Sequence, residues 1–273
     1  MPTWPRRDPP ARRQPPRVAA AALALAAAAA PTLASADDDA PSAQPYRPSV
    51  STPATLTAPG WIEIEGGLVH SRDDRARRDG LPVTAKLAFT PDWGVRVTAD
   101  AWVRTRDDSG SQVSGYGDTA FVVKRRFAVD EASAFGLEAA VLLPTAHRGV
   151  GSGSGKADYG INAIYSADFA SSWHADLNLQ PIRLGQIDAD TGRTLWLAAA
   201  SLAKSLDDHW GLVGEVSGTR RRGVADNGQF LLAASYSVSK RLVLDAGAAR
   251  TLHAGTPTWS AFTGFTWLAG RVF

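Results

Sequence analysis

The chain of 273 residues contains no cysteine, so it needs no disulfide framework and has no cysteine cluster for a metal ion. Beyond its first 36 residues it has no apolar run of about 18 residues, which excludes a membrane-spanning helix there. It also has no Walker-type phosphate-binding loop. We therefore expect neither a cofactor nor a metal ion.

The first 36 residues contain the three parts of a secretory signal peptide. Five arginines form a basic region, residues 18–30 form an apolar run, and Ala34-Ser35-Ala36 is a small-residue cleavage site. The alternative is a retained helical anchor, but this run is too short to cross about 30 Å of hydrocarbon at about 1.5 Å per residue. The sequence predicts cleavage after Ala36 and export from the cytoplasm.

Charge excludes one class of partner. Removal of residues 1–36 takes away five arginines and one aspartate, which leaves 24 basic and 26 acidic residues and a net charge of −2. A nearly neutral mature chain gives no compositional support for a nucleic-acid partner.

Residues 37–60 contain five prolines among Ser, Thr and Ala. Such a composition buries too little apolar surface to offset the entropy of ordering the chain. It predicts a flexible periplasmic leader. A proline-rich docking segment is the alternative, but no clear PxxP context accompanies it.

From residue 61 onward the chain alternates between apolar and polar residues, and helical periodicity is not sustained. Alternation with a period of two places successive side chains on opposite faces of a strand. The pattern predicts twelve strands, at 61–70, 81–90, 94–106, 116–128, 133–145, 157–168, 174–184, 195–205, 211–220, 229–238, 242–252 and 259–273. The segment 195–205 is apolar on both faces, so its faces cannot be assigned.

The last strand has an apolar face and a small or polar face and ends at Phe273. It resembles the closing strand of bacterial outer-membrane barrels, in which the terminal Phe belongs to the signal for the barrel assembly machinery. An edge strand of a soluble sandwich is the alternative. The connectors favour the barrel, because short and long connectors alternate, as periplasmic turns and extracellular loops do. Aromatic residues of an interfacial girdle flank the short turns: Trp93, Phe127, Phe169, Trp173, Trp210 and Phe273.

Together these features predict an all-β fold, a transmembrane up-and-down antiparallel barrel of about 12 strands over residues 61–273, with both chain ends on the periplasmic side. If the apolar faces meet lipid, the charged residues of the opposite faces line the lumen. These lumen candidates are Glu63, Glu65, Lys86, Arg96, Asp100, Arg104, Asp118, Lys124, Arg126, Glu138, Asp158, Asp176, Glu215 and Asp245. They either pair with one another as structural groups or form a constriction that selects solutes.

Several short motifs point to a family: Gly115-Tyr-Gly-Asp118, Leu143-Pro-Thr145, Gly151-Ser-Gly153, Asp158-Tyr159 and the opening Pro59-Gly-Trp-Ile-Glu-Ile-Glu65. With them, the chain resembles the outer-membrane family grouped as the MetA-pathway of phenol degradation. The family pattern has Gly where this chain has Ala146. The resemblance implies an outer-membrane channel of a Gram-negative bacterium for small solutes, including aromatic or hydrophobic compounds.

The loop after the fifth predicted strand is rich in glycine. Gly149, Gly151, Gly153 and Gly155 make it either a flexible tip or a gate that folds into the barrel. Ser152 and Ser154 lie near His147 in this loop, which raises the alternative of an outer-membrane hydrolase. Nothing in the sequence holds these residues rigid, so we expect no enzyme. A closed structural or adhesive barrel, with basic loops against lipopolysaccharide, is the remaining alternative.

Overall fold

The computed structural model describes residues 41–253 and 258–273, and within these ranges the chain forms strands, turns and irregular segments. No helix in the described part is long and apolar enough to cross a membrane. The predicted signal peptide, the cleavage after Ala36 and residues 37–40 lie outside the described residues. The strands are β1 (Trp61–Arg72), β2 (Ala76–Ala88), β3 (Trp93–Asp107), β4 (Gln112–Gly115), β5 (Thr119–Ala128), β6 (Ser133–Leu143), β7 (Asp158–Phe169), β8 (Trp173–Arg183), β9 (Thr194–Ser205), β10 (Trp210–Arg221), β11 (Asn227–Ser239), β12 (Leu242–His253) and β13 (Trp259–Arg271).

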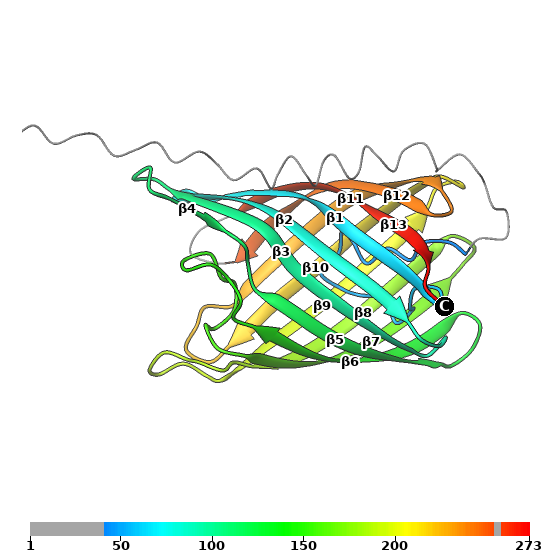
Figure 1. Ribbon diagram of the computed structural model, residues 1–273, viewed down its shortest axis with the longest axis horizontal. Helices are drawn as coiled ribbons and strands as arrows, with labels where there is room; N and C mark the ends of the chain where they lie inside the picture. The colour runs from blue at the N-terminus through cyan, green and yellow to red at the C-terminus, as the bar shows by residue number, and fades with distance from the viewer. Residues whose placement is uncertain (1–40, 254–257) are drawn as a thin grey trace, which may run out of the picture. The chain divides into compact units, whose positions relative to one another are not determined.

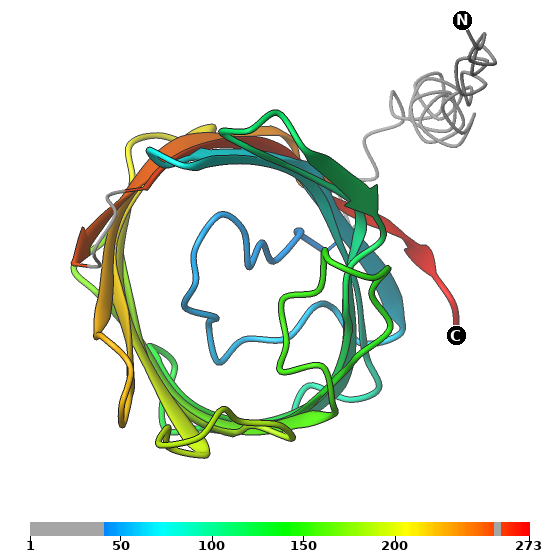
Figure 2. The same ribbon diagram turned by 90° about the vertical axis from the view of Figure 1, so that its left-hand side faces the viewer.

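Twelve of these strands close into a ring, because β2 pairs with both β1 and β3. Figure 1 shows the tilted strands from the side, and Figure 2 shows the ring end-on. Each long strand pairs antiparallel with its neighbours in the chain, and β1 pairs with β13 over its whole length, from Trp61 opposite Arg271 to Arg72 opposite Trp259. The short β4 adds only a hairpin to the outer end of β3. The prediction of a closed up-and-down barrel of twelve strands is confirmed.

Burial runs opposite to that of a water-soluble protein. On β8, Leu177 and Leu179 are 51% and 48% exposed. Asp176, which precedes them, and Asn178, which lies between them, are buried. The same inversion recurs around the ring, because large apolar side chains point outward and polar ones point inward. An exposed apolar belt of this extent requires a lipid environment.

A β-bulge in β3 reverses the faces of its outer end and corrects one predicted lumen residue. In the pairing of β2 with β3, Leu81 lies opposite Trp102 and Pro82 lies opposite Asp100, so Ala101 is skipped. Because one extra residue flips all following side chains, Arg104 points outward and bonds Asp79 at 2.6 Å. The assignment of Arg104 to the lumen is therefore wrong.

The connectors sort into two rims, which we call the short-turn rim and the long-loop rim. At the short-turn rim the strands are joined by 89–92, 129–132, 170–172, 206–209 and 240–241. At the long-loop rim, the connection 73–75 is unexpectedly short, because β1 and β2 extend beyond their predicted ends. The other long-loop connections are 108–118, which contains β4, then 144–157, 184–193, 222–226 and 254–258, of which 254–257 lie outside the described residues.

Aromatic side chains gather at the short-turn rim, as predicted. Trp93, Phe127, Phe169, Trp210 and Phe273 are each at least 40% exposed there. Several lie beside cations, since the Arg125 guanidinium lies 4.6 Å from the ring of Phe127. Aromatic rings that contact cations in this way are typical of the aromatic girdle at a membrane–water interface.

The structure also settles the faces of β9, which the sequence left open. Ser201 points inward and donates to Asp176 at 3.4 Å, and Ala199 on the same face is buried. Trp196 and Leu202 on the other face are 47% and 42% exposed. The strand therefore follows the alternation of its neighbours, and alanines fill its inner face.

Segment 41–60, expected to be a flexible leader, lies inside the ring (Figure 2). It contacts the short-turn rim at one end, where the Ala43 amide donates to the Lys240 carbonyl at 2.7 Å. At its other end, the Gly60 carbonyl accepts from the Val272 amide at 2.7 Å. The expectation of a flexible leader is thus wrong for residues 41–60, because the barrel wall supplies the partners that their own composition lacks.

Candidate functional site

The site is the interior of the barrel, and its main occupant is the segment 41–60. An irregular segment has no internal ladder of hydrogen bonds, so its buried amides need acceptors from elsewhere. Three glutamates of the wall provide them. Glu63 accepts from the Gln44 amide and Glu65 from the Tyr46 amide, both at 2.7 Å.

The third glutamate binds the tip of the segment. Glu215 on β10 accepts from the amides of Val50 and Ser51 at 3.0 and 2.8 Å and from the Ser51 hydroxyl at 2.7 Å. Its carboxylate is almost fully buried. Charge-assisted bonds to backbone amides are among the stronger hydrogen bonds in proteins, so this carboxylate is a major anchor of the tip.

Two buried lysines, Lys86 on β2 and Lys124 on β5, bind the same segment. The Lys86 ammonium lies 2.6 Å from both the Gln44 carbonyl and a Glu65 oxygen. The Lys124 ammonium lies 2.6 Å from the Pro53 carbonyl and 3.1 Å from a Glu138 oxygen. Each buried cation is therefore paired with a carboxylate and also donates to the segment, which offsets part of its desolvation cost.

Tyr46 lies between these two cations. The Lys86 and Lys124 ammonium nitrogens are 3.8 and 4.2 Å from the centre of its ring. Its hydroxyl donates to the Thr55 carbonyl at 2.6 Å, which joins the two arms of the segment. Burial raises the pKa of the Tyr46 hydroxyl well above its ordinary value, so this hydroxyl stays neutral at physiological pH.

Amide side chains on β7 and β8 hold the middle of the segment. Asn178 accepts from the Thr52 amide and donates to the Thr52 carbonyl, both at 3.0 Å. The neighbouring Asn162 donates to Asn178 at 2.9 Å and to Glu138 at 3.1 Å. Arg47 of the segment forms an ion pair with Asp245 on β12 at 3.2 Å. The segment is therefore tied to strands on several sides of the barrel.

The glycine-rich loop 144–157 also folds into the barrel mouth rather than away from it (Figure 2). Asp118 accepts from the amides of Ser152 and Gly153, both at 2.8 Å. A Cβ atom on Gly151 would lie 3.1 Å from the same carboxylate, so a side chain there would crowd the Asp118 oxygens. Asp158 binds the next turn through the amide and hydroxyl of Ser154.

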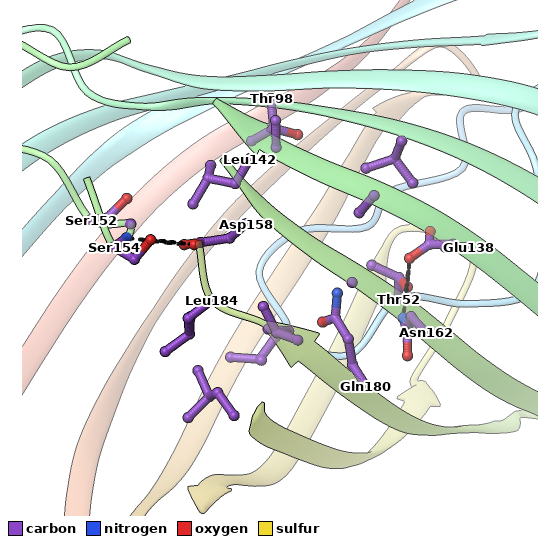
Figure 3. Close-up of a pocket in the computed structure, with 18 of the residues that line it drawn as sticks. Thr52, Thr98, Glu138, Leu142, Ser152, Ser154, Asp158, Asn162, Gln180 and Leu184 are labelled. Atoms are coloured by element: carbon purple, nitrogen blue, oxygen red, sulfur yellow. Dashed lines mark hydrogen bonds between the residues drawn. The ribbon is translucent and has the colours of Figure 1, made fainter. Parts of the chain in front are cut away.

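A cavity of about 810 Å³ lies between segment 41–60 and the long-loop rim (Figure 3). Its floor contains Thr52, Glu138 and Asn162, and its roof contains the loop residues Ser152 and Ser154. The apolar part of its wall comes from four strands and one loop: Ala120, Val122, Ala140, Leu142, Ile182, Leu184, Ile187 and Leu195. The cavity is thus apolar on one wall and polar at its floor and roof.

Three buried polar atoms of residues that line this cavity have neither a hydrogen bond nor an ion pair in the described part of the protein, namely Arg96 Nε, Arg221 Nε and Asn162 Oδ1. The two guanidinium nitrogens are donors and the amide oxygen is an acceptor. Because unpaired buried polar atoms are costly, they are positions where a ligand that offers both kinds of group gains free energy on binding.

Thirteen of the fourteen predicted lumen residues point into the barrel, and Arg104 is the exception. The structure brings most of them onto segment 41–60 or loop 144–157, as described above. Asp100 instead contacts Arg78 at 3.5 Å, and Arg126 is half-buried near the short-turn rim. Gly149 and Gly155 have φ values of +86° and +84°, which favour glycine.

The sequence prediction missed the inner residues Asn162, Ser166 and Asn178. The alternation carried the signal for them, because Asn162 and Ser166 share a face of β7 with Asp158, and Asn178 shares a face of β8 with Asp176. The sequence also suggested a hydrolase as an alternative, because Ser152 and Ser154 lie near His147 in the chain. No hydrogen bond joins His147 to Ser152 or Ser154 in the described structure, and the Ser154 hydroxyl is bonded to Asp158.

Solved structures of channels and porins share this fold. The COG4313 outer-membrane channel from Pseudomonas putida F1 matches with a TM-score of 0.65 and 14% identity, over 78% of this chain and 97% of that one. The NanC porin matches with a TM-score of 0.55 and 10% identity, over 76% and 98%. The CymD monoaromatic hydrocarbon channel matches with a TM-score of 0.50 and 9% identity, over 79% and 90%. At these identities the likeness establishes the barrel fold.

No curated protein matches the chain in sequence. The family described as "Putative MetA-pathway of phenol degradation" does match, over residues 81–269. The match begins in β2 and ends in β13, so it covers most of the barrel. It agrees with the resemblance carried by Gly115-Tyr-Gly-Asp118 and Leu143-Pro-Thr145. This chain is therefore an outer-membrane β-barrel that belongs to the MetA-pathway of phenol degradation family.

Proposed function

We propose that this protein is an outer-membrane channel for small solutes, and that the lumen cavity is where the solute is held. The observation that carries this proposal is the cavity of about 810 Å³ that is lined by the wall, the segment 41–60 and the loop 144–157. Its volume lies within the range of about 300–1,000 Å³ that is usual for small-molecule sites. The membership of the family and the channels among its structural neighbours support the same class of function.

The lining of the cavity favours a solute that is mainly apolar and carries a hydrogen-bonding group. Leucine and isoleucine side chains cover one wall, while the unpaired Arg96 Nε and Asn162 Oδ1 offer a donor and an acceptor. Small aromatic compounds with a polar substituent fit this division. The CymD channel, whose name refers to monoaromatic hydrocarbons, is consistent with such a solute.

Segment 41–60 is the proposed constriction. It occupies the half of the lumen nearer the short turns and is held there by the predicted lumen residues Glu63, Glu65, Lys86, Lys124 and Glu215. A solute that leaves the cavity toward the short-turn rim must displace this segment or pass beside it. In this proposal Gly149, Gly151, Gly153 and Gly155 give loop 144–157 the freedom to admit the solute from the other side.

The placement of the chain in the envelope is also proposed. Residues 1–36 act as a signal peptide cleaved after Ala36, and Phe273, 59% exposed at the chain end, is the signal read by the barrel assembly machinery. The long-loop rim faces outward and the short-turn rim faces the periplasm, as in other barrels of this type. The outer rim then contacts lipopolysaccharide.

Two measurements test the channel. Purified protein in planar bilayers is expected to give small discrete conductance steps, and deletion of the gene is expected to reduce uptake of small aromatic compounds. Substitutions in the cavity, such as Arg96→Gln with Asn162→Leu, are expected to change uptake without loss of the folded barrel. Absence of both conductance and uptake would overturn the proposal.

A closed structural or adhesive barrel is the second candidate, and one observation favours it. The segment 41–60 is bonded to the wall on several sides, including Glu65, Asn178 and Asp245. A permanently fixed segment would seal the lumen. The same bilayer measurement separates the two candidates, because a sealed barrel gives no conductance at any voltage.

A further inference from the structure

The outward face of the barrel carries a row of arginines that no other part of the structure explains. Arg72 on β1 lies directly opposite Arg77 on β2, and Arg77 lies directly opposite Arg106 on β3. On the other side of β1, Arg72 lies opposite Trp259, which lies opposite Arg250. Like charges that face each other across strands repel, so this row of three adjacent arginines destabilises the free protein unless something neutralises it.

The row just below it, nearer the membrane centre, is neutralised by the protein itself. Asp79 lies between His70 and Arg104, and its carboxylate is 2.7 Å from the His70 ring and 2.6 Å from the Arg104 guanidinium. By contrast, Arg72 and Arg77 form no ion pair with any described residue, and Arg106 contacts only the amide oxygen of Gln112 at 3.3 Å. All three are exposed. The positive charge at this level is therefore left for a partner.

The height of the row identifies the surroundings of that partner. Arg72 is 11 residues from Trp61, the first residue of β1 at the short-turn rim. At about 3.3 Å per residue and a tilt of about 45°, this distance corresponds to a height of about 26 Å. The apolar band of outer-membrane barrels is about 25 Å tall. Arg72 and Arg77 therefore lie where the acyl chains end and the outer headgroups begin, beside the belt residue Trp259.

We propose that Arg72, Arg77 and Arg106 form a binding site for the phosphates of the lipid A part of lipopolysaccharide. Guanidinium groups bind phosphate through paired hydrogen bonds, and three of them on adjacent strands match a ligand with two phosphates. The bulge at Ala101 builds the site, because it turns the outer end of β3 so that Arg106 shares the outward face with Arg72 and Arg77. This inference rests on the outward orientation of the long-loop rim proposed above, and it does not require an open channel.

The test is a binding titration of the full mature protein in detergent micelles with bisphosphorylated lipid A, read by native mass spectrometry. Replacement of the site by R72Q/R77Q/R106Q is expected to weaken binding on the order of 100-fold, since each basic residue near an anionic lipid surface contributes a factor of about five. Dephosphorylated lipid A is expected to bind the unaltered protein as weakly as the variant binds the phosphorylated form. Inorganic phosphate at equal concentration is expected to leave binding unchanged.

The matched control is R148Q/R220Q/R222Q, which removes three exposed arginines from other positions at the same rim. It is expected to change lipid A affinity less than twofold. Equal losses in both triple variants, or equal binding of dephosphorylated lipid A, would overturn the site. If R72Q/R77Q/R106Q does not fold, as judged by heat-modifiable migration, R77Q alone is expected to weaken binding about fivefold, and no loss in R77Q would overturn the site. Conductance of the variant in bilayers without lipopolysaccharide reports on the proposed channel separately.

Discussion

Segment 41–60 and loop 144–157 are two irregular stretches that lie inside the same barrel and are held in different ways. The segment is bonded to wall residues on β1, β2, β5, β8, β10 and β12. The loop is held mainly by two carboxylates, Asp158 at its own C-terminal end and Asp118 from the connection before β5. The segment is thus fixed to strands on several sides of the lumen, whereas the loop is held mainly on one side, by Asp118 and Asp158.

The comparison shows what the buried charges of this barrel do. Backbone amides away from water need acceptors, and in both stretches the inward-facing carboxylates are those acceptors. Lysines then balance the carboxylates around the segment, as Lys124 does for Glu138 at 3.1 Å. The charges line the lumen chiefly as an anchoring surface for chain, and the solute space is the part of the lumen that neither stretch fills.

The largest effect is expected from removing the segment. Deletion of residues 41–58, which leaves Pro59 and Gly60 to enter β1, is expected to raise the unit conductance several-fold, because a twelve-stranded lumen then lacks its main filler. Deletion of residues 151–153 from the loop is the comparison and is expected to give a smaller rise. Equal conductance with and without the segment would show that it does not obstruct the pore.

A single wall residue tests the anchoring directly. Glu215→Ala leaves the Val50 amide, the Ser51 amide and the Ser51 hydroxyl without their acceptor. We expect a loss of about 1–3 kcal/mol in unfolding free energy in micelles, the cost of leaving buried donors unpaired. Asp226→Asn, which affects only the exposed contact of Arg220 with Asp226 at 3.9 Å, is the control with an effect near zero. A similar loss of stability in both variants would show that Glu215 does not anchor the segment.

The loop is expected to respond locally. Asp118→Ala removes the acceptor of three loop amides, those of Ala146, Ser152 and Gly153. Because Arg148 is exposed in this loop, trypsin is expected to cleave after it faster in the variant, with a stability loss of about 1 kcal/mol. Glu215→Ala should leave that cleavage rate unchanged. Faster cleavage in both variants would mean that the two stretches move together.

The smallest effect concerns Tyr46. Tyr46→Phe removes the bond to the Thr55 carbonyl at 2.6 Å, and we expect a loss of about 0.5–1.5 kcal/mol. The pKa of Tyr46 is raised in the folded state above its ordinary value of 10.0. Its contribution is therefore complete below about pH 10 and is lost as the pH rises further, since the unfolded chain ionises first. The phenylalanine variant should lack this decline, and an identical decline in both proteins would contradict the assignment.

Alternation made the barrel predictable from the sequence, because each strand repeats apolar and polar positions over about ten residues. Alternation no longer indicates the face of a side chain once an extra residue breaks the period of two. The bulge at Ala101 leaves no mark in the composition, yet it moves Trp102 and Arg104 to the outer face. Asn162 and Asn178 also follow the alternation on inner faces, so the rule that places charged residues in the lumen predicts both when it is extended to amides.

The composition of segment 41–60 wrongly predicted a flexible leader, and the reason is physical. Prolines lack the amide donor, so five of them reduce the number of acceptors that an irregular buried stretch needs. The same prolines and small residues are typical of a disordered linker. Composition therefore cannot separate a free linker from one whose partners lie far away in the chain, such as Glu215 for Ser51.

Cross-linking tests the position of the segment most directly, because the chain has no cysteine of its own. In T52C/N178C, the two new thiols replace side chains whose Oγ1 and Oδ1 atoms are 3.3 Å apart. We predict that an oxidant joins them in the folded protein in lipid vesicles, and that T52C/T266C, which pairs Thr52 with a strand on the far side of the ring, stays reduced. Failure of T52C/N178C to cross-link, with both thiols open to a membrane-impermeant reagent, would show that segment 41–60 lies outside the barrel.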